Sequence, residues 1–150
     1  MNEMSDKHSH CHSFAKRLGL FIIRVGFGIL FIVHGYPNLI AGPTVWASLG
    51  STMSLLGITF APAFWGFGCV VAEFFGGIFL TVGLFTRIVS VFMALDMVLA
   101  LMYHINKGDP FMVFSNPLKA LIVFVGLMLM GGGKLSLDRY LCKKRSAERV

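Results

Sequence analysis

Four long apolar stretches, separated by short polar or Gly- and Pro-containing segments, fill most of the 150-residue chain. Each is close to the roughly 20 residues that a helix needs to cross a bilayer core of about 30 Å. None shows the alternation of a barrel strand, and a helix satisfies all of its backbone groups within one segment. The pattern predicts four membrane-spanning helices: Leu18 to Pro37, Pro62 to Leu84, Ile88 to His104, and Pro117 to Gly131.

The segment between the first two predicted spans follows a different pattern. From Thr44 to Ile58, apolar residues recur at spacings of three and four between serines and threonines, which is typical of an amphipathic helix. Trp46 suits the headgroup level of a membrane. We therefore expect an all-α membrane protein, an antiparallel four-transmembrane-helix bundle with a short interfacial helix between helices 1 and 2.

Composition and charge support a membrane location. Hydrophobic residues make up 56% of the chain and charged residues only 13%, too few to cover a soluble globule. Most lysines and arginines precede the first span, occupy the turn after the second or follow the fourth. By the positive-inside rule, this predicts a multi-pass protein of the cytoplasmic (inner) membrane with both termini in the cytoplasm. The net charge of +6 then reflects the orientation of the protein in the membrane. We expect the basic residues to contact the lipid bilayer and not a nucleic acid.

These patterns divide the chain into three parts. Residues 1–17 are expected to form a flexible, His-rich cytoplasmic tail, residues 18–140 a four-helix membrane domain, and residues 141–150 a basic cytoplasmic tail.

Three ionisable residues, Arg24, Glu73 and Asp96, lie inside three different spans. Charges at this depth are costly and mark candidate functional sites. The two acids stand at the midpoints of their spans and Arg24 lies about four residues from the centre of the first, roughly 6 Å along a helix. We expect the three to form an intramembrane polar cluster that binds a ligand, with one carboxyl holding a proton because one arginine cannot neutralise both. The alternative is a structural clamp between Arg24 and Glu73 that fixes helix register.

Three further candidates lie at the opposite ends of the spans. His34 ends the first predicted span, and Tyr103 and His104 end the third, so we expect them to define an outer mouth of the bundle. Two imidazoles there could hydrogen-bond a quinone carbonyl, bind a metal or ligate haem. We favour a different interpretation over metal or haem binding, in which both histidines lie at the rim of the bundle and face water and headgroups.

The amino-terminal tail carries a dense set of potential ligands for copper or zinc: His8, His10, Cys11 and His12. Such a set lacks the packed second shell that strengthens metal sites. The three cysteines include no C-x-x-C pair, which disfavours an oxidase that passes electrons through a dithiol.

Four stretches of the chain carry recognisable motifs: Arg24 to Gly28, His34 to Leu39, Glu73 to Arg87, and Gly131 to Asp138. The most specific, in the third stretch, is a glutamate followed by paired glycines and a Gly-x-x-Thr-Arg turn. Together these motifs resemble the DoxX family of small four-helix membrane proteins. The chain departs from the family's pattern at Asn38, where a lysine is common, and at Leu118 to Ala120, where an acidic residue is common.

The resemblance implies a subunit of a quinone-reducing oxidoreductase, or part of a membrane redox and oxidative-stress system. Because the sequence holds no flavin, nucleotide or haem fingerprint, electrons would have to come from a soluble or membrane redox partner. Our leading hypothesis is a redox-linked membrane subunit that binds a quinone or similar flat apolar ligand near Arg24, Glu73 and Asp96. The alternatives are a non-catalytic anchor or assembly subunit for a soluble oxidoreductase, and metal handling through the His-rich tail. The glycine-rich helices would also permit a homodimer.

Overall fold

The computed structural model describes the backbone of residues 2–141 and the side chains of residues 14–141. This part of the chain contains no strand. Its helices are α1 (Asn2–Ile40), α2 (Pro43–Gly50), the 3₁₀ helix η1 (Ser51–Leu56), α3 (Pro62–Val82), α4 (Thr86–Asn106) and α5 (Phe111–Met130), and residues 137–141 are also helical. Four segments are long and apolar enough to cross a membrane: Phe14–Ile40 within α1, then α3, α4 and α5. The prediction of an all-α protein with four membrane-spanning helices is confirmed.

The prolines do not end the helices where the sequence suggested. Pro37 lies inside α1 and Pro117 lies inside α5, so the predictions that they close the first span and open the fourth were wrong. Pro110, with φ −65° and ψ 156°, instead precedes the first turn of α5. A proline inside a membrane helix is tolerated because neighbouring groups compensate for the lost backbone hydrogen bond. The start six residues earlier, at Phe111, places Asn116 on the helix as well.

The helix between the first two spans is present, but it has two parts, because α2 gives way to η1 at Ser51. Trp46 does not lie free at the surface. Its indole N–H donates to the Asn38 carbonyl oxygen over 2.9 Å, and its ring packs 4.7 Å from the Phe67 ring between centroids. These contacts hold α2 against the ends of α1 and α3.

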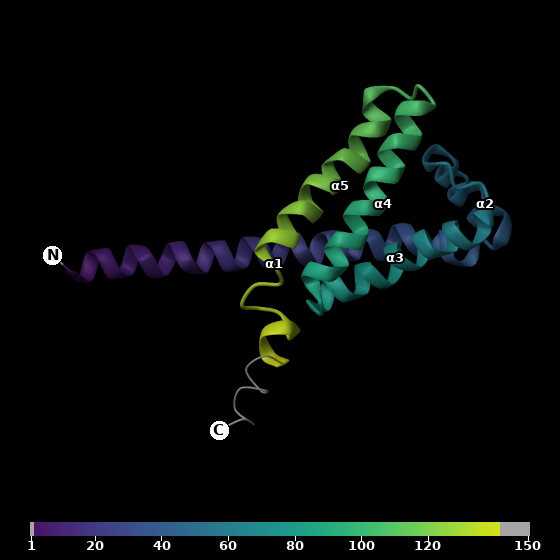
Figure 1. The fold of residues 1–150 in the computed structure, drawn as a ribbon. Helices are drawn as coiled ribbons and strands as arrows, with labels where there is room; N and C mark the ends of the chain where they lie inside the picture. Colours follow the sequence, from purple (N-terminus) through teal and green to yellow (C-terminus); the bar gives the residue numbers. More distant parts are fainter. Residues whose placement is uncertain (1, 142–150) are drawn as a thin grey trace.

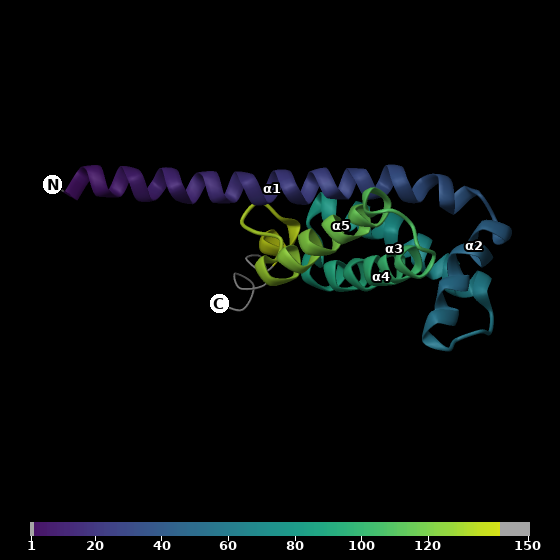
Figure 2. The same ribbon diagram turned by 90° about the horizontal axis from the view of Figure 1, so that it is seen from above.

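The four spans form two helix pairs. α1 packs along α3, and α4 packs along α5. The pairs are joined by the α3–α4 turn and diverge away from it, so that the molecule has a triangular outline (Figure 1). Figure 2 shows α2 at the end of the α1–α3 pair that lies away from this turn. η1 contacts both α3 and α4, so it crosses the open side between the pairs.

Small residues allow the first pair to pack tightly. A Cβ built on Gly28 of α1 would lie 2.8 Å from the carbonyl oxygen of Gly77 in α3, and a Cβ on Gly77 would lie 2.7 Å from the oxygen of Gly28. The two backbones therefore touch without side chains between them, which is a common way for helices to associate in lipid.

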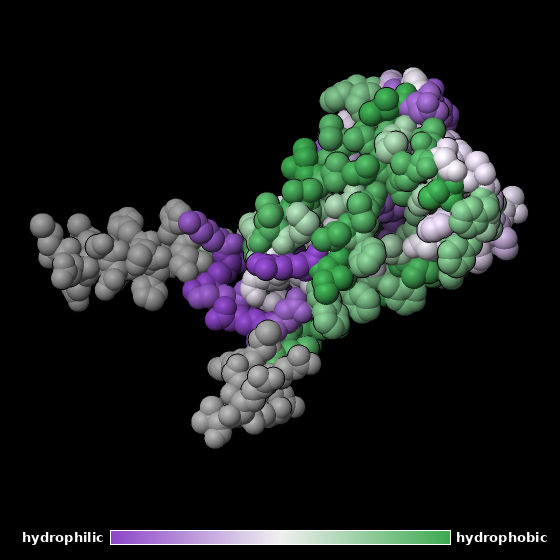
Figure 3. Space-filling view, in the orientation of Figure 1, coloured by the Kyte–Doolittle hydropathy of each residue, from purple (hydrophilic) through white to green (hydrophobic). Residues whose placement is uncertain are grey.

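The buried core is small and the outer surface is apolar. Core side chains such as Leu80, Met93 and Phe124 fill the space between the helices, while large apolar residues such as Phe64 and Phe92 are exposed. Figure 3 shows apolar surface over most of the visible face of the helices. A surface of this kind is suited to lipid acyl chains.

Candidate functional site

Arg24 lies at the closed end of the bundle and is almost completely buried, with 1% of its surface exposed. Its guanidinium donates from Nη1 to the Leu80 carbonyl oxygen over 2.9 Å and from Nη2 to the Leu135 carbonyl oxygen over 2.7 Å. Leu80 is in the last turn of α3, and Leu135 follows α5. Arg24 therefore connects three parts of the chain that are distant in sequence.

Gly83, which ends α3, makes room for this guanidinium. Its φ of +75° is unfavourable for other residues, and a Cβ at this position would overlap the Arg24 guanidinium. The Asp138 backbone N–H donates to the Gly83 carbonyl oxygen over 3.0 Å. The Asp138 carboxylate in turn accepts hydrogen bonds from the backbone N–H groups of Phe85, at 2.7 Å, and Thr86, at 3.0 Å. The segment after α5 thus caps the first turn of α4 and closes this end of the bundle.

The expected cluster of Arg24, Glu73 and Asp96 does not form. Leu80, the partner of Arg24, lies seven residues beyond Glu73 on α3, which corresponds to about 10 Å along the helix axis. The proposed clamp between Arg24 and Glu73 is absent for the same reason. The arginine instead binds backbone carbonyl oxygens. One lies in the last turn of α3, where carbonyl groups lack a partner within the helix, and the other lies in the loop after α5.

Glu73 and Asp96 do come together, from α3 and α4. Both side chains line one cavity of about 260 Å³, together with Asn38 and Cys69, and η1 and α2 cover this cavity with side chains such as Thr52. Two acids that face one cavity at mid-membrane depth are an unusual arrangement, because each charge is costly to bury and the two repel.

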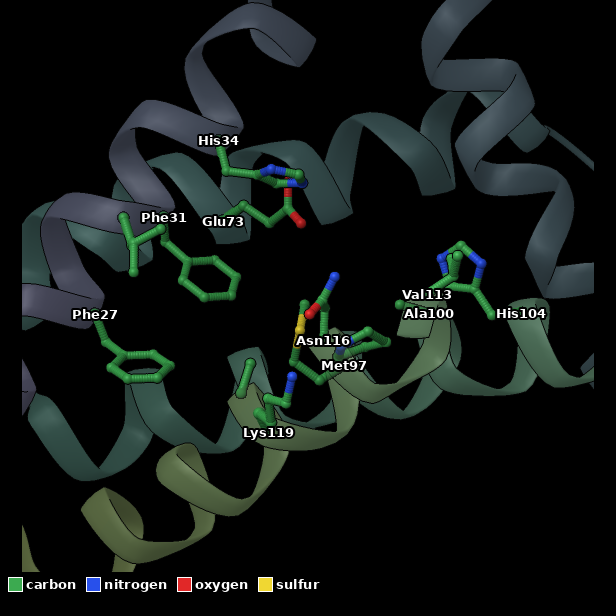
Figure 4. Close-up of a pocket in the computed structure, with 13 residues that line it drawn as sticks. Phe27, Phe31, His34, Glu73, Met97, Ala100, His104, Val113, Asn116 and Lys119 are labelled. Atoms are coloured by element: carbon green, nitrogen blue, oxygen red, sulfur yellow. The ribbon is translucent and has the colours of Figure 1, made fainter. Parts of the chain in front are cut away.

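A larger cavity of about 500 Å³ adjoins the first and shares His34, Glu73, Ala100 and His104 with it. Phe27 and Phe31 of α1 and Met97 of α4 give it apolar walls. Figure 4 shows the polar ends of Glu73, Asn116 and Lys119 directed into the space between the helices. We call the two cavities together the outer cleft, because they lie between the diverging helix pairs. The size and the mixture of aromatic and polar walls are typical of a small-molecule site.

The predicted outer-mouth residues are gathered at this cleft. His34 and His104 line both cavities, and Tyr103 lines the smaller one. His104 has a partner that sequence reasoning missed: its Nδ1 lies 2.7 Å from Oδ2 of Asp109, in the loop after α4. An imidazole that donates Nδ1–H to this carboxylate presents an unprotonated Nε2 as an acceptor. The five-residue spacing across the end of a helix gave no recognisable motif.

Asn116 and Lys119 were also missed as lining residues. Asn116 lay outside the predicted fourth span, which began at Pro117, and Lys119 lay inside that span but was not among the candidate residues. Residues 14–141 contain no group of three His, Cys, Asp or Glu side chains that could hold a metal ion. The predicted copper or zinc ligands His8, His10, Cys11 and His12 lie outside the residues whose side chains the structure describes.

The sequence model of the DoxX family matches residues 19–105, more than half of the chain. The chain belongs to the DoxX family. It is 29% identical over 127 residues to a protein of Bacillus subtilis (strain 168) named "Putative oxidoreductase CatD", with 84% of this chain and 89% of that protein covered. It is also 29% identical over 130 residues to "Inner membrane protein YqjF" of Escherichia coli (strain K12), with 85% of this chain and 95% of that protein covered. No solved structure gives a significant match.

These comparisons establish a DoxX-family membrane protein and support a multi-pass inner-membrane location. The matched region includes the residues of α1, α3 and α4 that line the outer cleft, while Asn116 and Lys119 of α5 lie beyond it.

Proposed function

We propose that this DoxX-family protein is a membrane subunit of a redox-linked system and binds a quinone, or a similar flat apolar ligand, in the outer cleft. The observation that carries the proposal is the cavity of about 500 Å³ between the helix pairs, with Phe27 and Phe31 on one wall and Glu73, His34 and His104 in reach. A planar ring packs well against aromatic side chains. Ring carbonyls can accept hydrogen bonds from the polar groups, and a prenyl tail suits the lipid around the helices.

The acid pair has a plausible task in quinone chemistry. Reduction of a quinone to a quinol takes up two electrons and two protons, so a binding site needs proton donors close to the ring. One proton shared by Glu73 and Asp96 would remove their repulsion and supply a donor inside the cleft. His104, oriented by Asp109, would carry protons between the cleft and the membrane surface. The electrons would come from a partner protein, and the name of the CatD relative supports a redox setting.

Charge distribution supports one orientation of this site. Lys16 and Arg17 on α1, Arg87 in the first turn of α4, and Lys134 and Arg139 after α5 belong to the closed end of the bundle. By the positive-inside rule this end faces the cytoplasm, with both termini. The outer cleft then opens toward the opposite side of the inner membrane.

Two matched substitutions test the binding site. Ala100→Phe adds a ring where the two cavities of the outer cleft meet. Ala72→Phe adds the same volume to a separate apolar groove between α3 and α4. We expect a short-chain ubiquinone to bind the wild type and the Ala72→Phe variant equally well, and to bind the Ala100→Phe variant at least tenfold more weakly. Binding would be measured by quinone retained on the purified protein and by titration in detergent.

Glu73→Gln then separates binding from proton supply. It keeps the shape of the side chain, so we expect quinone to remain bound while quinol formation with a supplied reductant slows. The anchor hypothesis predicts no quinone binding by any form of the protein. Equal binding by the Ala100→Phe variant and the wild type would remove the outer cleft from the function.

A further inference from the structure

Another pocket, separate from the outer cleft, lies at the closed end of the bundle. Its volume is about 440 Å³, and its lining includes Arg87, Lys134 and Arg139 together with the glycine loop of residues 131–133. Arg87 is in the first turn of α4, and the glycine loop begins directly after α5. Because both helices span the membrane, their ends place this pocket at the membrane edge.

The pocket has an excess of positive charge. Among the side chains of residues 14–141, no lysine or arginine nitrogen lies within 4.0 Å of a carboxylate oxygen, so none of the three cations is paired with an acid from that part of the chain. Asp138 also lines the pocket, but its carboxylate already accepts the two backbone N–H groups at the start of α4. No acid of residues 14–141 therefore competes with a ligand for these cations.

The glycine loop lets Arg87 lie across the pocket. Gly131 has a φ of +71°, and a Cβ on it would lie 3.0 Å from Nε of Arg87, so a larger residue would displace the guanidinium side chain. The Nη2 of Arg87 makes one long hydrogen bond, 3.4 Å, to the Leu129 carbonyl oxygen. No other hydrogen bond of this guanidinium forms within residues 14–141, so its remaining N–H groups can bind oxygen atoms of an anion.

The surface beside the cations is apolar. Ile88, Leu129 and Met130 expose 58%, 69% and 57% of their surface next to Arg87 and the glycine loop. In Figure 3, hydrophilic surface gathers where α1 leaves the bundle and the segment after α5 lies, and it borders the apolar surface of the helices. A soluble anion would use only the charged half of such a site, whereas a phospholipid would use both halves.

We propose that Arg87, Lys134 and Arg139 bind the phosphate of an anionic phospholipid, with its acyl chains against Ile88, Leu129 and Met130. The exposed apolar side chains favour a lipid over free phosphate, because they can contact its acyl chains. The three cations favour an anionic headgroup over a zwitterionic one. The bound lipid would bridge the start of α4 and the segment after α5, where the bundle is closed. This site does not depend on the function proposed for the outer cleft.

The test compares lipids that differ only in their headgroup. The full chain, purified in detergent, is titrated with dioleoylphosphatidylglycerol or dioleoylphosphatidylcholine, and bound lipid is measured by native mass spectrometry. We expect tighter binding of the phosphatidylglycerol. Because each cation near an anionic headgroup contributes about 1 kcal/mol, Arg87→Gln should weaken that binding about fivefold. The triple variant Arg87→Gln, Lys134→Gln, Arg139→Gln should lose the preference. Lys107→Gln, a matched charge loss in the loop at the opposite end, should leave it unchanged.

Salt and free phosphate provide tests that need no variant. Added NaCl should weaken the binding of phosphatidylglycerol more than that of phosphatidylcholine, because it screens charge. Equal binding of the two lipids by the wild type, or an unchanged preference in a folded triple variant, would overturn the proposal. Stronger displacement of the lipid by inorganic phosphate than by NaCl at the same ionic strength would overturn it too, by indicating a site for soluble anions. Quinone binding by the Arg87→Gln variant should equal that of the wild type, so that failure of one proposal leaves the other intact.

Discussion

Arg24→Met tests whether the buried arginine holds the closed end of the bundle together. Methionine keeps an unbranched side chain of similar length but has no N–H donors. The substitution removes the bonds to Leu80, at 2.9 Å, and to Leu135, at 2.7 Å, and it leaves both carbonyl oxygens without this partner. A third contact, 3.4 Å to the Thr81 carbonyl oxygen, is too long to add much.

The expected loss lies between two reference values. A hydrogen bond from a charged group contributes about 1.5–3 kcal/mol in soluble proteins, whereas bonds between membrane helices average about 0.6 kcal/mol and reach about 1.7. Two such bonds therefore predict a loss of about 1–6 kcal/mol. A larger loss is not expected, because methionine also removes the cost of burying a charge.

The loss can be measured by reversible unfolding in mixed micelles with increasing SDS, followed by the far-ultraviolet helical signal. Arg17→Met, on the exposed surface of the same helix, is the matched control and should change stability by less than about 0.5 kcal/mol. If Arg24→Met proves as stable as the wild type, or more stable, the carbonyl contacts do not secure this end of the bundle and the reasoning fails.

Two further substitutions test the packing and the cap of α4. Gly77→Ala should destabilise the protein by about 1–3 kcal/mol, because the added Cβ would lie 2.7 Å from the backbone oxygen of Gly28. Gly68→Ala, on the same helix with no atom within 4 Å of the added Cβ, is its control and should be neutral or stabilising; equal losses for the two would contradict close α1–α3 packing. Asp138→Asn should cost about 0.5–2 kcal/mol, because the charged cap of two N–H groups at the start of α4 is lost. Thermal unfolding in detergent would measure that loss, and an unchanged midpoint would show that the cap is dispensable.

Hydropathy predicted the number and type of the spans well, because the length of an apolar run is a direct consequence of membrane thickness. It predicted the ends of the helices poorly at the prolines. Pro37 and Pro117 lie inside helices, because neighbouring groups compensate for the lost backbone hydrogen bond. The DoxX motifs identified the family. They could not show which way α4 and α5 diverge from α1 and α3, because that depends on where small residues let helices touch.

The candidate site was predicted in part. Depth along the helices predicted that Glu73 and Asp96 lie at one level, since both stand at the middle of their spans, and both line the smaller cavity of the outer cleft. The same argument failed for Arg24, because a long side chain can reach along its helix toward free carbonyl oxygens as readily as toward an acid. Asp109 was missed as the partner of His104 because loop geometry decides that contact.

The divergence of the two helix pairs has a mechanical consequence. Each helix of the α4–α5 pair is about 30 Å long at 1.5 Å per residue, and the pair is joined to α3 at one end by a short turn. A rotation of about 5° at that turn would move the far tips by roughly 2.5 Å over this lever arm. Modest bending next to Gly83 would thus change the width of the outer cleft, while every helix stays intact.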